Sequence, residues 1–109
     1  MTDMINLIAN FSKILADPVK LRIIKLLKEN NRTSKEIQEI LDLSQSYAST
    51  QLKKLKDKGI IEFNKEGKNK RYNIADQKIL AIISEIGDFV IKREKERLSK
   101  IARFEASGF

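Results

Sequence analysis

The sequence predicts a mainly α-helical fold that carries one small β-hairpin. Apolar residues recur at helical spacing over most of the chain, and several of these stretches open with a residue type that caps helices. Near the middle, two short runs of β-branched and aromatic residues flank a glycine-containing loop, which is typical of a hairpin. With 109 residues, 41% of them hydrophobic, and no low-complexity linker, the chain is expected to form a single domain over residues 1–109.

Three helices are predicted in the first part of the chain. The first covers residues 2–15, where apolar residues follow a helical period. The second opens at Asp17-Pro18, because the Asp side chain can cap free backbone amides and Pro needs no donor at the first helical position. A Ser/Thr-x-x-Glu pattern at residues 33–36 is a capping box, and it predicts a short third helix.

A fourth helix and the hairpin follow. The tight turn at Asp42-Leu43 leads to a helix that Ser44 can cap and that ends at Gly59, where glycine permits the left-handed conformation. Two short helices joined by three or four residues, here over residues 34–58, are the outline of a helix-turn-helix. The hairpin over residues 60–74 then has the position of a wing, so the predicted fold is a winged helix-turn-helix.

The last predicted element is a long helix, from a cap at Asp76 to about residue 102. Its isoleucines and other apolar residues fall on one wide stripe. The first and last helices, within residues 1–15 and 76–104, together carry more apolar surface than so small a domain can cover. That surplus favours a dimer, although both stripes could instead close the core of a monomer.

The composition argues against catalysis and against a membrane protein. The chain has no Cys and no His, which excludes disulfides and thiolate chemistry and removes the commonest general base and metal ligand. We therefore expect no enzymatic activity, no cofactor and no metal. The first 15 residues include Asp3 and Asn6, and this stretch is neither a signal peptide nor a membrane span. We expect no membrane association and a cytoplasmic location.

The net charge of +7 is concentrated in one stretch. Residues 51–72 hold eight Lys or Arg and three Asp or Glu, a net charge of +5. Such a cluster is either a solvated charge run or a contact surface for an anionic partner. The charge alone does not distinguish these two interpretations.

The fourth helix gives this charge a context. Helical projection puts Ala48, Leu52 and Leu55 on the buried side and hydroxyl, amide and lysine side chains on the opposite side. Hydroxyl and amide groups can bond base edges, and lysines can bind phosphates, which predicts double-stranded DNA as the partner. The alternative is an ordinary amphipathic helix beside a basic loop. The candidate contacts in the helix are Ser44, Gln45, Ser46, Tyr47, Ser49, Thr50, Lys53 and Lys54, and those in the wing are Lys65, Lys68, Asn69, Lys70 and Arg71.

Three stretches of the sequence carry a resemblance to a known family. They are LADPVKLRIIKLL at residues 15–27, LSQSYASTQLKKL at 43–55 and GII at 59–61. Together they resemble the ArsR/SmtB family of bacterial and archaeal repressors. The resemblance implies a transcriptional repressor that binds an inverted repeat as a homodimer formed by the first and last helices. It also implies base or nearby phosphate contacts from Gln45, Ser46, Ser49 and Thr50. The dimer contacts would come from Ile5, Ile8, Phe11, Ile79, Ile83, Ile86 and Val90.

The chain departs from the family pattern at the family's metal sites. One family site needs Cys around residues 36–39, and the other needs His near Lys78 and Phe89, where this chain has neither. Gln51 also stands where the family often has His. The resemblance therefore supports DNA binding without a metal response, and the effector is unknown.

Two other functions remain open at this point. A winged helix can serve as a protein-interaction module, in which the basic surface meets an acidic partner, or as a general chromatin-binding module. The polar face of the fourth helix argues against a protein dock, since docks favour aromatic and aliphatic anchors.

Overall fold

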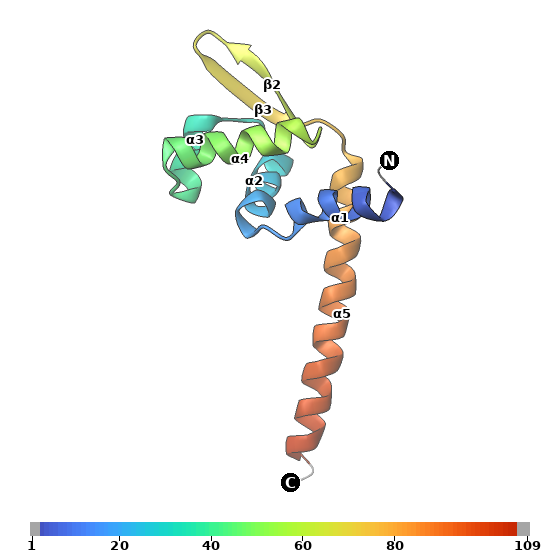
Figure 1. The fold of residues 1–109 in the computed structure, drawn as a ribbon. Helices are drawn as coiled ribbons and strands as arrows, with labels where there is room; N and C mark the ends of the chain where they lie inside the picture. The colour runs from blue at the N-terminus through green and yellow to red at the C-terminus, as the bar shows by residue number, and fades with distance from the viewer. Residues whose placement is uncertain (1–2, 107–109) are drawn as a thin grey trace. The chain divides into compact units, whose positions relative to one another are not determined.

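The computed structural model describes residues 3–106, and the side chains only as far as residue 103 (Figure 1). It has the predicted mainly helical fold with a small antiparallel sheet, and the described chain divides into two compact units, one through Gln77 and the other from Lys78. The expectation of a single domain stays a prediction. The elements are α1 (Met4–Leu15), α2 (Pro18–Glu29), β1 (Arg32–Thr33), α3 (Ser34–Leu41), α4 (Gln45–Asp57), β2 (Ile61–Glu66), β3 (Asn69–Ile74) and α5 (Lys78–Ala106).

A side chain caps each of the first four helices, and the caps of α2, α3 and α4 are the predicted ones. Asp3 caps α1, and Asp17 accepts hydrogen bonds from two backbone amides at the start of α2, with Pro18 as the first helical residue. The capping box of α3 is complete, because the Thr33 and Glu36 side chains each bond the backbone amide of the other residue. These local signals were sufficient to predict where α2, α3 and α4 begin.

The end of α4 and the start of α5 differ from the predicted positions by two residues. α4 ends at Asp57, and Gly59 follows it with φ +74°, the left-handed conformation expected of a glycine after a helix. α5 begins at Lys78, and so Asp76 lies two residues before the helix. α5 also continues to Ala106 instead of ending near residue 102.

The sheet has a third strand that the sequence did not predict. Its order is β1-β3-β2, and both pairs are antiparallel. The hairpin turn is tight, because β2 and β3 pair as far as Glu66 and Asn69 and leave only Gly67 and Lys68 in the turn. Gly67 has φ +60°, which a glycine adopts at little cost.

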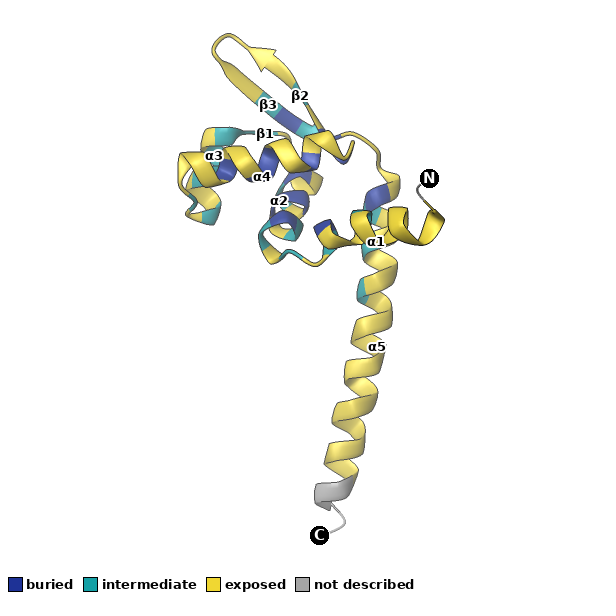
Figure 2. Ribbon diagram, in the orientation of Figure 1, coloured by how far each residue is buried: buried dark blue, intermediate teal, exposed yellow. Residues whose placement is uncertain are grey.

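The core of the first unit consists mainly of aliphatic residues, and most of its buried positions lie on α1, α2, α3, α4, β2 and β3 (Figure 2). Burying an isoleucine or leucine side chain contributes about 1.5 to 3 kcal/mol, so this small set supplies much of the hydrophobic stabilisation of the unit. α4 packs its apolar side into this core, which fixes the rotation of the helix about its axis. The largest fully buried side chains are Ile23, Ile24, Ile37, Leu52, Leu55 and Ile61.

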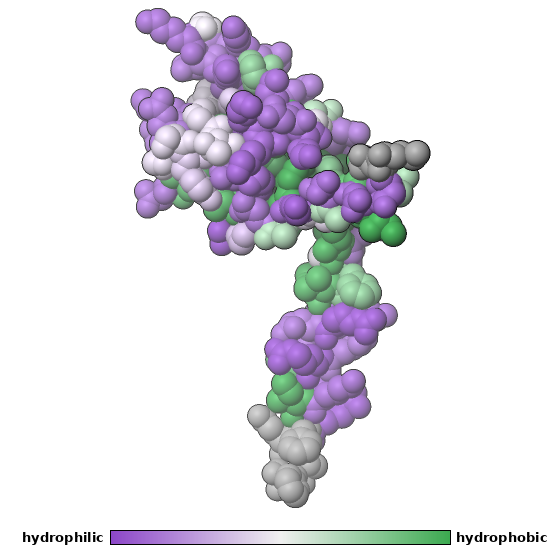
Figure 3. Space-filling model, in the orientation of Figure 1, coloured by the Kyte–Doolittle hydropathy of each residue, from purple (hydrophilic) through white to green (hydrophobic). Residues whose placement is uncertain are grey.

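The second unit is the helix α5, which carries exposed apolar side chains. Figure 3 shows hydrophobic surface along this helix, interrupted by a hydrophilic stretch. Ile82, Ile86, Phe89 and Val90 are among the exposed apolar residues. Of the helices in the described part of the chain, none is long and apolar enough to cross a membrane.

Candidate nucleic-acid interface

The exposed face of α4 carries all the side chains that the sequence predicts for it. Ser44 accepts a hydrogen bond from the Tyr47 amide at 3.2 Å and so caps the helix. Because Ala48, Leu52 and Leu55 are buried, the opposite side is turned to solvent. Ser44 and the candidate contacts within the helix are all exposed: Gln45, Ser46, Tyr47, Ser49, Thr50, Lys53 and Lys54.

Two of these side chains have partners on their own helix. The Thr50 hydroxyl donates to the Ser46 carbonyl at 3.0 Å, and Lys53 pairs with Asp57 at 3.2 Å. An exposed ion pair such as that of Lys53 contributes little stability, and an exposed hydroxyl such as that of Thr50 can turn to another partner. The polar groups of this face are therefore available to an incoming ligand.

A groove of about 510 Å³ joins α4 to the wing. Gln45 and Ser49 line it from α4, and the predicted wing residues Lys68, Asn69 and Lys70 line it from the hairpin. The structure thus brings together two sets of candidate contacts that are separated in the sequence.

The same groove includes residues that were not predicted as contacts. Ser34, Lys35 and Gln38 line it from α3. Gln38 donates to the Ser34 hydroxyl at 3.1 Å, which holds both polar side chains in place. The polar side of α3, opposite the buried Ile37, was the sequence signal that could have found them.

The wing concentrates positive charge on a hairpin. Lys65 and Lys70 lie directly opposite each other across the two strands, and like charges in this position destabilise a sheet. Lys70 lies 4.5 Å from the centre of the Phe63 ring, and Lys56 of α4 lies 5.3 Å from the same ring. Phe63, which sequence reasoning missed, therefore draws one lysine of the wing and one of α4 together.

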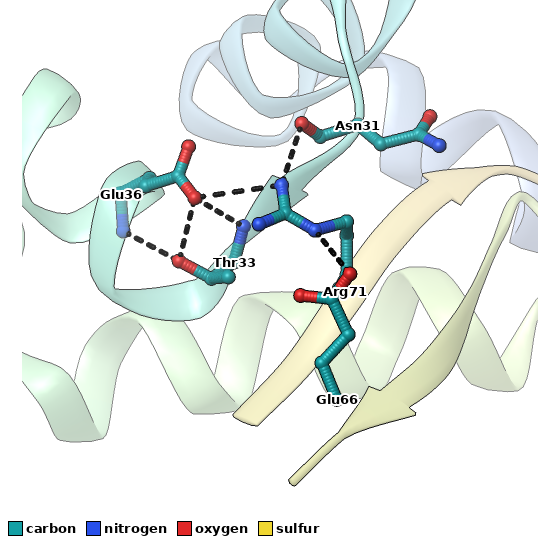
Figure 4. Close-up of polar contacts among 5 residues, drawn as sticks. All are labelled: Asn31, Thr33, Glu36, Glu66 and Arg71. Atoms are coloured by element: carbon teal, nitrogen blue, oxygen red, sulfur yellow. Dashed lines mark hydrogen bonds and ion pairs between the residues drawn. The ribbon is translucent and has the colours of Figure 1, made fainter. Parts of the chain in front are cut away.

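Arg71, a predicted phosphate contact, has partners within the protein (Figure 4). Its guanidinium donates to Glu66 at 3.0 Å and to the Asn31 carbonyl at 3.3 Å, and it lies 3.5 Å from Glu36. The hydrogen bonds from Thr33, and then the charge of Arg71, lower the pKa of Glu36. Arg71 thus joins the wing to the start of α3, and its contact with phosphate stays a prediction.

A buried polar link fastens α4 to α2. Lys20 and Gln51 are both buried, and the Lys20 ammonium donates to Gln51 Oε1 at 2.5 Å and to Asp17 Oδ2 at 2.8 Å. The hydrogen bond from Lys20 is the main cause that lowers the pKa of Asp17. Sequence reasoning missed the link, since its two ends are 31 residues apart.

The predicted dimer contacts differ in exposure. Ile5, Ile8, Ile86 and Val90 are exposed, and Phe11 and Ile83 are half-buried. Ile79 is only 5% exposed in the single chain, and so it offers little surface to a partner. Among residues 3–106, no group of three or more acidic side chains is arranged to hold a metal ion.

The comparisons with known proteins agree with this geometry. Residues 17–62 match the family model for bacterial regulatory proteins of the arsR family. The chain is 32% identical over 75 residues, 69% of its length, to a probable mercury resistance operon repressor of Streptomyces lividans. It is 28% identical over 80 residues, 73% of its length, to a transcriptional repressor SmtB homolog of Synechocystis. The chain covers only 60% and 61% of these two relatives.

Among solved structures, the fold is similar to that of M. tuberculosis Rv0081. The TM-score is 0.84 at 27% identity, and the match covers 90% of this chain and 99% of the other. The family is one of regulatory proteins and not of enzymes, as the sequence predicts. The predicted ArsR-type winged helix-turn-helix is thereby confirmed. Residues 17–62 of the chain thus form a helix-turn-helix domain that matches the arsR family of bacterial regulatory proteins.

Proposed function

We propose that this chain is a sequence-specific transcriptional repressor that binds an inverted repeat in double-stranded DNA as a homodimer. The observation that carries the proposal is the groove in which the polar side chains of α4 meet the lysines of the wing. A repressor of this kind occupies promoter DNA in the cytoplasm and excludes the transcription machinery. Its relatives named as repressors support this function.

In the proposed complex, α4 lies in the major groove. Gln45 is at the N-terminal end of the helix, where an amide side chain can bond adenine with two hydrogen bonds. Ser46, Ser49 and Thr50 have short side chains, which let the helix approach the bases closely. The wing lysines bind phosphate, which also relieves the repulsion between Lys65 and Lys70.

The homodimer would form through the apolar faces of α1 and α5. A second copy of the same chain is always available as a partner. The two-fold symmetry of such a dimer would present two α4 helices to two half-sites. Exposed isoleucines on both helices support this arrangement. The proposed repressor responds to no metal, because the chain has neither Cys nor His. Its occupancy would then follow its concentration or an organic effector.

The proposal is tested by selecting bound sequences from a random duplex pool, with single-stranded RNA as the control. We expect an inverted repeat whose half-sites lie about one helical turn apart, and binding that weakens steeply with salt. Binding to all duplexes alike would indicate a general chromatin protein instead. Capture of one stoichiometric protein without any selected DNA would indicate an interaction module. Either outcome would overturn the proposal.

A further inference from the structure

A second basic hollow lies beside α4, away from the wing groove. It has a volume of about 450 Å³ and is bordered by the end of α1, the start of α2 and the last part of α4. Its charged residues are Lys13, Lys20, Lys54, Asp57 and Lys58, four cations and one anion. The hollow is therefore strongly positive.

Three of these lysines have no partner in the described part of the chain. Asp57 pairs with Lys53, and the buried Lys20 bonds Asp17 and Gln51. Lys13, Lys54 and Lys58 are exposed, and within residues 3–106 their ammonium groups make no ion pair or hydrogen bond. They are free to bind an anion.

The helix dipole explains only part of this arrangement. Lys13 lies in the last turn of α1, Lys54 in the last turn of α4, and Lys58 directly after it, where a cation is favoured by about 0.3 to 1 kcal/mol. That effect acts on each helix separately. It gives no reason for the lysines of two helices to border the same hollow.

The two hollows lie on opposite flanks of α4. At 100° per residue, Lys54 and Lys58 fall on one flank, and Gln45 and Ser49, which line the wing groove, fall on the other. Ser46 and Thr50 lie between the flanks. The helix thus has polar side chains along its middle and positive charge on both sides.

A helix in a major groove about 12 Å wide has one phosphate backbone on each flank. We propose that Lys13, Lys54 and Lys58 bind phosphates of the backbone that lies across the major groove from the wing. The inference rests on the proposed function. It adds Lys13 and Lys58 to the interface and assigns the two sides of α4 to the two DNA strands.

The test measures how the affinity for the selected duplex depends on salt. The slope of log K against log salt concentration is negative, and each lost phosphate contact reduces its magnitude by about 0.9. We expect Lys13→Gln combined with Lys58→Gln to reduce that magnitude by about 1.8 for each protomer and to leave the sequence preference unchanged. Lys28→Gln is the matched control, because Lys28 is exposed and lines neither hollow. Circular dichroism checks that the variants fold.

The outcomes separate this inference from the proposed function. If the wild type binds with a steep slope and the double variant keeps it, the inference is wrong and the proposed function stands. If the wild type binds no duplex, both fail. The hollow could instead hold a free anion. In that case, inorganic phosphate at constant ionic strength would raise the Tm of the wild type but not that of the double variant, and the two proteins would have the same salt slope for DNA binding. That result would also overturn the inference.

Discussion

The helices α4 and α5 are both amphipathic, but they differ in which side is covered. In α4 the apolar side chains Ala48, Leu52 and Leu55 are at most 1% exposed, and the uncovered side is polar. In α5 the apolar side is itself largely uncovered, with Phe89 61% and Val90 56% exposed. The apolar side of α4 is thus already buried in the single chain, whereas much of the apolar surface of α5 is still exposed.

This difference indicates what each helix binds. A polar face with lysines beside it loses little by staying in water, and it gains most from a polyanion. An apolar stripe gains from removal of water, at about 25 cal/mol per Å² of buried surface, which a protein partner supplies. This contrast supports the proposal that α4 binds DNA and that a second copy of the chain covers the apolar side of α5.

The largest effect is expected when a leucine is replaced by alanine in α4, and the same substitution in α5 serves as the comparison. Leu52→Ala, which creates a cavity in the core beneath α4, should lower the free energy of unfolding by about 3 kcal/mol. Leu98→Ala in α5 should lower it by less than about 1 kcal/mol, because Leu98 is 53% exposed. Urea denaturation measures both. Equal losses would mean that α5 is packed as fully as α4.

The second prediction concerns the stripe of α5. Ile86→Glu combined with Val90→Glu should weaken the dimer roughly 100-fold, because it forces unpaired carboxylates into an apolar interface. Sedimentation velocity over a range of concentrations gives the dissociation constant. Ile91→Glu is the control, since Ile91 is as exposed as Val90 but lies about 100° away from it around the helix. A dimer that tolerates the double variant would contradict the assigned interface.

The third prediction concerns the link that holds α4 to α2. Asp17→Ala should cost about 2 kcal/mol near pH 7, because it removes the cap of α2 and one partner of the buried Lys20. Asp3→Ala is the control, because Asp3 caps α1 but bonds no buried ammonium. It should cost about 1 kcal/mol or less.

The same substitution has a defined pH dependence. The pKa of Asp17 is lowered in the folded protein from its ordinary value of 3.8. Its carboxylate therefore stabilises the fold above about pH 4, and this stability is lost as the pH falls through the lowered pKa. The difference between wild type and Asp17→Ala should narrow below pH 4 in denaturant titrations. A difference that is constant down to pH 2 would show that the ion pair contributes nothing.

Local signals made most of the fold predictable. Caps act within a few residues, so the sequence was enough to predict the helix starts at Asp17, Thr33 and Ser44. The strand β1 was missed because two residues show no periodicity and its partners, Arg71 and Tyr72, are about 40 positions away.

The residues of the candidate site that are defined by their exposure on a helix could be predicted from the sequence. The contacts between residues far apart in the sequence could not. The polar face of α4 follows from its helical period alone. The partners of Arg71 and the link between Lys20 and Gln51 depend on tertiary pairing, which leaves no pattern in the sequence. For this reason the sequence predicts Arg71 only as a DNA contact, and it shows Gln51 only as a departure from a family pattern.

The most direct test of the central claim measures base discrimination by α4. Two duplexes are compared: the selected inverted repeat and a variant of it in which the base pair that Gln45 contacts is changed in both half-sites. The wild type should bind the selected repeat more tightly than the variant by about 1.5 kcal/mol. Gln45→Ala should abolish this difference, and Lys68→Ala in the wing should weaken binding to both duplexes equally. Titrations of the three proteins at one salt concentration measure these differences. Full discrimination by Gln45→Ala at every position of the half-site would contradict the claim that Gln45 of α4 reads the bases.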